Sequence, residues 1–143
     1  MRILLDTNIP VRAAISPTGL ARGILDRIRG NDDHVLVISS YIVSEVADVL
    51  SRPRIRARWP LSDDDIQRYC QSLSSAAEGV SIRQLTGAIA DPKDQAIIET
   101  AVAGRVNVIC TGDVHLDAQP VREFLVCFGI AVVTDRDLIA LLK

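Results

Sequence analysis

Four acidic side chains stand at positions where they could act together. Asp6 directly follows the first apolar segment of the chain, Asp113 closely follows a later one, and Glu45 and Asp94 lie on predicted helices. In an open parallel α/β sheet, ligands bind beyond the carboxyl ends of the strands. The four carboxylates could therefore converge on one edge of such a sheet.

Glu45 and Asp94 occupy helix positions where a carboxylate is unexpected. Glu45 shares a helical face with Ile42 and Val49, so a charge falls on what should be an apolar stripe. Asp94 precedes Ile97 on the inward face of its helix, which directs it towards the sheet. Burying either charge without a partner would be costly, and this favours a functional reason for both.

The chemistry that such a group favours is metal-dependent. Carboxylates at close range repel one another and raise their pKa values unless a cation lies among them. A ligand set made only of oxygen atoms indicates Mg²⁺ or Mn²⁺. Neither histidine has metal-ligand spacing, and no S-x-x-K, G-x-S-x-G or Cys-His pairing indicates a covalent nucleophile. The predicted nucleophile is therefore a water molecule activated by a metal ion.

Each acid also has a purely structural interpretation. Asp6 could cap a turn, Asp94 could interact with the helix dipole from its first turn, and Asp113 could be a turn residue after glycine. Glu45, in the middle of a helix on an apolar face, is the hardest of the four to explain in this way.

The elements that must position these side chains follow from the hydrophobic pattern. Short apolar segments predict strands at residues 2–5, 35–38, 79–82, 106–110 and 130–133. Helical spacing and capping residues predict helices at residues 18–29, 41–51, 62–78 and 91–104, the last closed by its glycine. Because parallel strands need crossover connections, this alternation predicts an α/β fold with a parallel sheet between helices.

Composition narrows the class of protein. The chain has 143 residues, of which 48% are hydrophobic, and this suits a single globular domain over residues 1–143. The apolar runs are too short for a membrane span or a signal peptide, so we expect a soluble cytoplasmic protein. The cysteines Cys70, Cys110 and Cys127 are far apart in the sequence, which predicts core residues in a reducing compartment. A net charge of −2 argues against bulk electrostatic coating of nucleic acid.

Four short motifs, in this order along the chain, resemble those of the PIN domain family. They are Leu5-Asp6-Thr7-Asn8, Ser44-Glu45-Val46, Asp91-Pro92-Lys93-Asp94 and Thr111-Gly112-Asp113. Each motif alone is weak, but the ordered set covers nearly the whole chain. The chain is most similar to the bacterial and archaeal PIN proteins described as toxins of toxin–antitoxin pairs.

The resemblance implies a fold, an activity and a set of site residues. The fold would be a three-layer α/β/α PIN-like domain with a mainly parallel sheet of about five strands. The activity would be that of a Mg²⁺- or Mn²⁺-dependent endoribonuclease that acts on an RNA substrate. A cognate antitoxin would inhibit it, and it would form homodimers. By this resemblance the acidic metal and catalytic positions are Asp6, Glu45, Asp94 and Asp113, and the supporting residues are Asn8, Thr111 and Asp91.

One departure from the family pattern follows Asp113. Many relatives have a second aspartate two residues later, where this chain has His115, and Asp117 lies a further two residues on. This departure places a second metal position in doubt. We interpret His115 as a solvent-facing loop residue and leave it out of the catalytic set.

A basic segment follows the helix that carries Glu45. An acidic pocket repels RNA, so contacts to phosphate must come from other residues. Arginine binds phosphate well, and Trp59 offers a stacking face beside the four alternating arginines. A solvated loop between helices is an equally good interpretation. The candidate RNA contacts are Arg52, Arg54, Arg56 and Arg58.

Three other classes of protein compete with this interpretation. A PIN-like module could bind RNA or protein without cutting, although such a module has no evident need for four acids. Phosphoryl-transfer domains of haloacid-dehalogenase or receiver type also place aspartates at strand ends, but the former require D-x-D-x-T and Asp6 is followed by Thr7-Asn8. A dinucleotide-binding fold is disfavoured because no G-x-G-x-x-G follows a strand.

Overall fold

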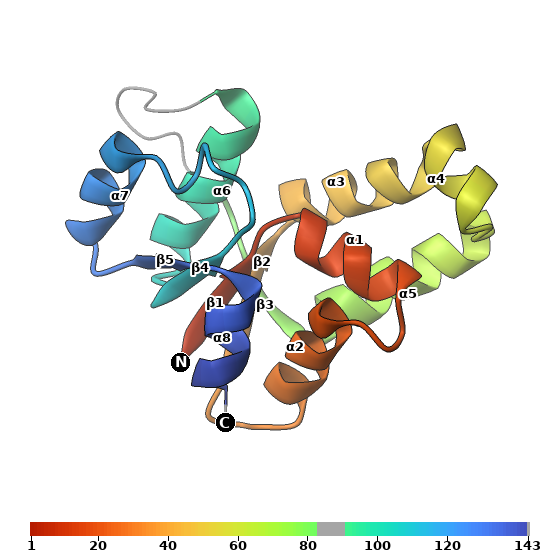
Figure 1. Ribbon diagram of the computed structural model, residues 1–143, viewed down its shortest axis with the longest axis horizontal. Coiled ribbons are helices and arrows are strands. Elements are labelled where there is room, and N and C mark those ends of the chain that lie inside the picture. The colour runs from red at the N-terminus through yellow and green to blue at the C-terminus, as the bar shows by residue number, and fades with distance from the viewer. Residues whose placement is uncertain (83–90, 143) are drawn as a thin grey trace.

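The computed structural model describes residues 1–82 and 91–142. These residues contain a sheet of five parallel strands in the order β3-β2-β1-β4-β5 (Figure 1). The predicted α/β fold with a parallel sheet is confirmed. The strands are β1 Arg2–Leu5, β2 Val35–Ser39, β3 Ala77–Val80, β4 Val108–Cys110 and β5 Ala131–Val133.

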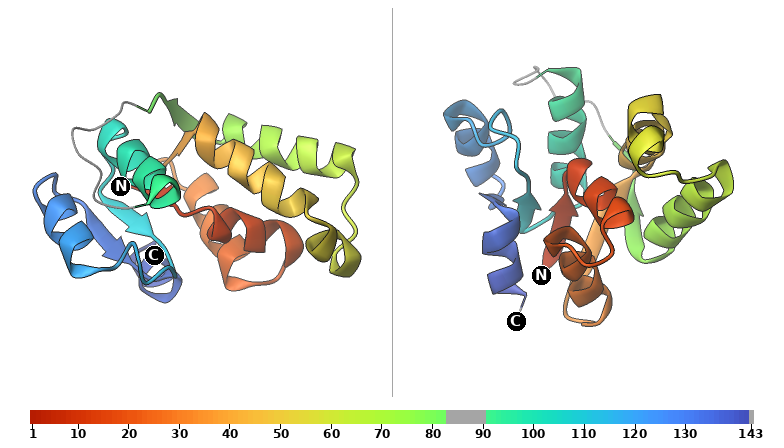
Figure 2. Two further views of the ribbon diagram at one scale, coloured as in Figure 1. Left: turned by 90° about the horizontal axis from the view of Figure 1, so that it is seen from above. Right: turned by 45° about the vertical axis from the view of Figure 1, so that its right-hand side comes forward.

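Helices cover both faces of this sheet. The helices α6 and α7 lie on one face, and α1, α2 and α8 lie on the other (Figures 1 and 2). This division follows from right-handed crossovers, because the chain steps along the sheet in one direction from β1 to β3 and in the opposite direction from β4 to β5. The helices are α1 Asn8–Ile15, α2 Leu20–Arg29, α3 Ser40–Ser51, α4 Pro53–Arg58, α5 Asp63–Ser75, α6 Pro92–Ala103, α7 Gln119–Val126 and α8 Asp135–Leu141.

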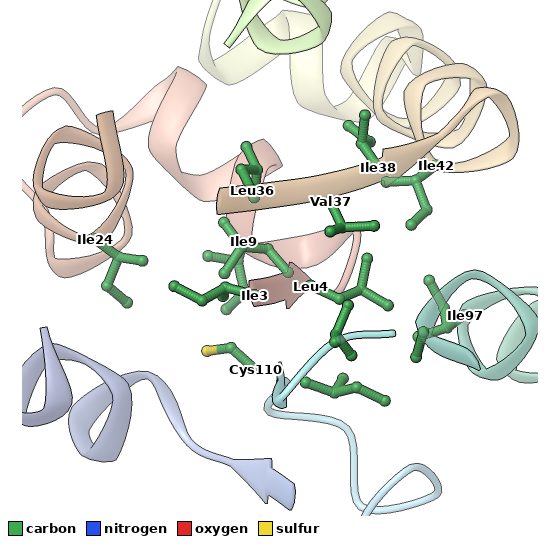
Figure 3. Close-up of a cluster of buried hydrophobic side chains, with 14 of the residues drawn as sticks. Ile3, Leu4, Ile9, Ile24, Leu36, Val37, Ile38, Ile42, Ile97 and Cys110 are labelled. Atoms are coloured by element: carbon green, nitrogen blue, oxygen red, sulfur yellow. The ribbon is translucent and has the colours of Figure 1, made fainter. Parts of the chain in front are cut away.

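The central strand β1 is buried on both of its faces. Ile3 and Leu4 are fully buried, with exposed fractions of 0%. Ile3 points towards the side of Ile24 on α2, and Leu4 points towards the side of Ile97 on α6 (Figure 3). Burial on both faces explains why this strand is a continuous apolar run rather than an alternating one. It also places the carboxyl end of β1 in the middle of the row formed by the carboxyl ends of the five strands.

The helices α3 and α5 form a long arm beside the sheet. They run side by side, and α4 connects their far ends (Figure 2). The start of α5 is fixed by the capping box that the sequence predicts. The Ser62 hydroxyl accepts a hydrogen bond from Asp65 N at 3.1 Å, and the Asp65 carboxylate accepts one from Ser62 N at 3.0 Å.

Four helices were not expected from the hydrophobic pattern. The helices α1, α4, α7 and α8 have 8, 6, 8 and 7 residues, so each is too short for a helical period to stand out. The interhelical segment after α3 begins α4 with Pro53 in its first turn, where proline costs no hydrogen bond. The sequence-based interpretation of this segment as a loop is therefore wrong.

The third strand begins earlier than predicted. Helix α5 ends at Ser75, and β3 pairs with β2 from Ala77, whereas the pattern predicts a helix to residue 78 and a strand from residue 79. Ala77, Glu78 and Gly79 carry little apolar signal. Pairing with β2, rather than local propensity, therefore decides where this strand begins.

Two expectations drawn from composition have different outcomes. Within the described residues, no helix combines the length and apolarity needed to cross a membrane. Cys70 and Cys110 are buried free thiols, as predicted. The prediction is wrong for Cys127, which is exposed at the carboxyl end of α7. Spacing along the chain therefore does not decide whether a cysteine is buried.

Candidate metal centre

The carboxyl ends of β1 and β4 bring Asp6 and Thr111 together. Leu5 pairs with Cys110 in the sheet, and Asp6 N donates to Cys110 O at 2.9 Å. The next residue of β4, Thr111, is held in turn by β5 because Thr111 N donates to Val133 O at 3.0 Å. The two side chains that follow these strands therefore lie next to each other at the sheet edge.

Hydrogen bonds fix the buried Asp6 carboxylate. Its Oδ1 accepts from Thr7 N at 2.7 Å, and its Oδ2 accepts from the Thr111 hydroxyl at 2.8 Å. The Thr111 Oγ1 also accepts from Asp113 N at 2.9 Å, and Asp113 Oδ1 accepts from His115 N at 2.8 Å. The turn after β4 therefore holds both Asp6 and Asp113 in place.

The amino end of α6 supplies Asp94. Asp91 is the N-cap of this helix, and its Oδ1 accepts from Asp94 N at 3.0 Å. Pro92 follows in the first turn, where its fixed φ angle suits a helix. Asp94 is 8% exposed, whereas Asp91 is exposed. The Asp-Pro-Lys-Asp motif thus builds a capped helix whose third residue turns inward.

Helix α3 supplies Glu45 from the opposite side. The Ser39 hydroxyl caps α3 by accepting from Ile42 N at 3.5 Å, and it lies 2.9 Å from the Thr100 hydroxyl of α6. Both hydroxyls are buried. This contact ties the start of α3 to α6, which keeps Glu45 near Asp94.

These elements enclose a small polar cavity of about 170 Å³. It lies above β1, between the strands where the direction of the chain reverses, as expected for a ligand site in this class of sheet. All four predicted acids line it, and so does Asn8. Thr111, which is hydrogen-bonded to Asp6, does not line the cavity, and neither does Asp91. The lining residues are Asp6, Thr7, Asn8, Tyr41, Glu45, Val49, Arg52, Lys93, Asp94, Ile97 and Asp113.

The pKa values of the two buried acids of the cavity are raised. Burial raises the pKa of Asp6 and repulsion from Asp113 adds to this, although hydrogen bonds from Thr111 and Thr7 act against it. The pKa of Asp94 is raised by burial first, and then by the charges of Asp91, Asp113 and Asp6. The carboxylates therefore repel one another across a shared space.

The negative charge of these carboxylates also acts on Tyr41, which lines the same cavity. Burial raises the pKa of Tyr41, and the negative charges of Glu45, Asp91 and Asp94 raise it further. None of the four predicted acids takes part in an ion pair within residues 1–82 and 91–142. The cavity thus holds negative charge without a matching ion pair.

The family of the chain is shown by comparison with known domains. The PIN domain family matches residues 2–115. The chain belongs to the PIN domain family. This confirms the resemblance inferred from the four acidic motifs. No curated protein matches the sequence closely enough to serve as a relative.

A solved structure shares the fold of this PIN domain. It is a chain in the crystal structure of VapBC2 from Rickettsia felis bound to a DNA fragment from their promoter. The TM-score is 0.62 at 16% sequence identity, and the match covers 94% of this chain and 98% of that one. At this identity the likeness concerns the fold alone.

The donor set of this PIN domain fits a hydrated divalent cation. All the acidic donors are oxygen atoms, which suit Mg²⁺ and Mn²⁺. In the described part of the chain, no three histidine, cysteine or acidic side chains are close enough to hold an ion together. Mg²⁺ commonly keeps several water ligands and is held by one or two carboxylates, so a site for it does not need three protein ligands.

Residues beyond Asp113 lie outside the cavity. His115 is exposed, as expected, and its backbone N–H, rather than its ring, contacts Asp113. Asp117 is also exposed and forms an ion pair with Arg122 at 3.0 Å. Neither residue lines the cavity, although the charge of His115 acts on Asp94 and lowers its pKa slightly against the effect of burial.

Sequence reasoning missed two polar residues of the cavity wall. Tyr41 lies in the first turn of α3, and Lys93 lies in the first turn of α6. Arg52 was expected only as an RNA contact, yet it also lines this cavity. A usable signal was present for Tyr41 and Lys93, since both lie in the first turns of helices whose amino ends lie beside the cavity. Arg52 follows the other end of α3, and no local pattern marks it as a cavity residue.

Proposed function

We propose that this PIN domain is a ribonuclease that hydrolyses RNA phosphodiester bonds internally with Mg²⁺ or Mn²⁺. The observation that carries the proposal is the convergence of Asp6, Glu45, Asp94 and Asp113 on one cavity. Family membership supports it, because PIN domains of toxin–antitoxin systems are generally nucleases and such nucleases generally use divalent metal ions.

We assign different roles to the four acids according to how deeply each is buried. Asp6 and Asp94, which are buried, would hold the ion, and Asp113 would bind it directly or through water. Glu45 is half-buried and would either complete the ligand set or accept a proton from the attacking water. A bound Mg²⁺ or Mn²⁺ would supply a more acidic water molecule and neutralise charge on the phosphate. Thr111 and Asn8 would support the carboxylates, and Asp91 would support them as the cap of α6.

Two cations on the cavity wall suit a phosphate substrate. Lys93 and Arg52 both line the cavity, so a phosphate group entering it would meet positive charge as well as carboxylates. Donors aimed at developing negative charge stabilise the transition state of phosphoryl chemistry. We assign these two side chains to orienting the scissile phosphate.

The biological setting is part of the same proposal. The protein would be the toxin of a toxin–antitoxin pair, acting in the cytoplasm, inhibited by a cognate antitoxin protein and able to form a homodimer. The fold likeness to a chain of the VapBC2 complex supports this setting. Occupation of the acidic cavity by a basic segment of the antitoxin would account for inhibition.

Cleavage by the purified wild-type protein tests the activity. We expect single-stranded RNA to be cut internally in Mg²⁺ or Mn²⁺, no cleavage in chelator, and much weaker cleavage of DNA of the same sequence. Gel analysis of end-labelled substrates reads out both rate and position. Cleavage that persists in chelator would exclude the metal mechanism, and preference for DNA would exclude a ribonuclease.

A further inference from the structure

A second groove adjoins the acidic cavity. It has a volume of about 420 Å³, and it shares Val49 and Arg52 with the acidic cavity. The groove lies along α4, at the far end of the arm made by α3 and α5 (Figure 1). Its full lining is Val49, Arg52, Arg54, Ile55, Arg58 and Trp59. The two spaces therefore lie next to each other, with Val49 and Arg52 between them.

The groove combines apolar surface with cations. Val49, Ile55 and Trp59 are half-buried, whereas Arg54 and Arg58 are exposed. The Arg58 guanidinium lies 4.9 Å from the centre of the Trp59 ring, which is a cation–π distance. Within the described residues, neither Arg54 nor Arg58 forms an ion pair. Their charges are therefore available to an anionic ligand.

Helix α4 divides the basic segment into two sets. Arg54 and Arg58 are four residues apart on a helix, so they share the face that lines the groove. Arg56 lies between them in sequence and turns away to form an ion pair with Asp63 of α5. Of these three arginines, two therefore face the groove and one forms an ion pair with α5.

We propose that this groove binds a single-stranded segment of RNA next to the cleavage site. The proposal rests on the ribonuclease function proposed above. A nucleobase would stack on Trp59 against the apolar floor, while Arg54 and Arg58 would bind the phosphates on either side of it. Arg52, on the wall of both spaces, would guide the backbone from the groove into the acidic cavity.

Single-stranded RNA fits this surface better than a duplex. The faces of paired bases are covered by their neighbours in a helix, whereas an unpaired base can stack on an aromatic side chain. The arginines would also attract the RNA backbone to a protein that otherwise repels it, because the chain carries a net charge of −2 and its acidic cavity repels phosphate. An acidic protein segment would satisfy the arginines but would not need the half-buried Trp59 ring on the groove wall.

Binding measured without cleavage tests the groove. The assay is fluorescence anisotropy of a labelled single-stranded RNA of about twelve nucleotides, titrated with the Asp6→Asn protein in chelator at several salt concentrations. In that background, Arg54→Ser with Arg58→Ser is expected to weaken binding about tenfold or more. It should also reduce the slope of log K against log salt by about 1.4, because each single-strand contact contributes about 0.7.

Two further variants separate stacking from charge. Trp59→Ala should weaken binding by about fivefold to a hundredfold with an unchanged salt slope, and Trp59→Tyr should restore most of the affinity. Arg56→Ser removes the same charge from the same helix and should change affinity by less than about twofold, because Arg56 lies outside the groove. Melting temperatures of all the variants confirm that they are folded.

The outcomes distinguish the groove from the nuclease. If Arg56→Ser lost about half as much binding free energy as Arg54→Ser with Arg58→Ser, only net charge would matter and the proposal would fail. Unchanged binding by the groove variants would remove the groove from RNA recognition. If those variants instead lose affinity only for an acidic peptide, the groove is a protein site and the proposal fails. The assay uses no metal and measures no cleavage. It can therefore support RNA binding by the groove even if the cleavage experiment excludes a ribonuclease, and it can exclude the groove even if the protein cleaves RNA.

Discussion

Replacing Asp6 with asparagine is expected to reduce RNA cleavage by about a thousandfold or more, since a bound divalent ion supplies several kcal/mol of transition-state stabilisation. Asp6 is the most strongly held of the four acids, with hydrogen bonds from Thr7 N and the Thr111 hydroxyl. Asparagine keeps the size of the side chain and an oxygen acceptor but removes the charge. The folded structure should persist, as measured by circular dichroism and melting temperature.

Asp117→Asn is the matched control for this change. Asp117 follows the same turn but is exposed and pairs with Arg122 outside the cavity. We expect its cleavage rate to stay within about twofold of wild type, because a surface ion pair contributes little. Comparable losses in both variants, or metal-dependent activity retained by Asp6→Asn, would contradict the assignment of the cavity.

Replacing Asp94 with asparagine is expected to have opposite effects on stability in the absence and presence of metal. The pKa of Asp94 is raised by burial and by neighbouring acids, so its charged form is unfavourable in the metal-free protein. At pH 7 to 8 in chelator, Asp94→Asn should therefore have a higher melting temperature than the wild type, because the variant has no charge to bury at this position.

The pH dependence follows from the direction of that pKa shift. A group whose pKa is higher in the folded protein than in the unfolded chain contributes stability below the unfolded value and loses it as pH rises through the folded value. The ordinary value for aspartate is 3.8. The advantage of Asp94→Asn should therefore vanish below that pH and grow as the pH rises above it.

Metal should reverse the order of the two proteins. An ion that binds only the folded state stabilises it by about 2.7 kcal/mol when its concentration is a hundred times the dissociation constant. The wild type should gain this stability in Mg²⁺ or Mn²⁺, and Asp94→Asn should gain much less. Thermal melts at matched pH, with and without metal, check the reversal. Parallel gains in both proteins would exclude Asp94 as a ligand.

The parts of the site that were predictable are those fixed by sheet topology. Asp6 and Asp113 follow strands that turned out to be neighbours, so the rule that ligands bind at the carboxyl ends of strands was sufficient to bring them together. Glu45 and Asp94 were found because a carboxylate interrupts an apolar stripe. Each of these patterns, an acid after a strand or an acid on an apolar helix face, lies within one element or at its end. It can therefore be recognised in one sequence without knowledge of the tertiary structure.

The parts that were missed depend on contacts between elements. Tyr41 lines the cavity together with residues of α6, and the Ser39 hydroxyl that caps α3 is hydrogen-bonded to Thr100 of α6. Helix α1 was missed because eight residues with an internal proline show no clear period. Short helices of this kind are stabilised by tertiary packing rather than by propensity.

The basic segment after α3 also shows that contacts between elements cannot be predicted from a local pattern. Four alternating arginines look equivalent in the sequence, and nothing local distinguishes Arg56 from Arg54. The structure separates them because α5 places Asp63 beside Arg56, while α3 places Val49 beside the other face of α4. A long-range arrangement therefore decides which arginines remain available to a ligand.

The central claim is that the acidic cavity binds a divalent metal ion, and Mn²⁺ titration followed by electron paramagnetic resonance tests it without knowledge of the RNA target. We expect the wild type and Asp117→Asn to bind Mn²⁺ with the same affinity. The double variant Asp6→Asn with Asp94→Asn should bind it about a hundredfold or more weakly, since it loses both buried ligands. Equal Mn²⁺ affinity in all three proteins would contradict the account.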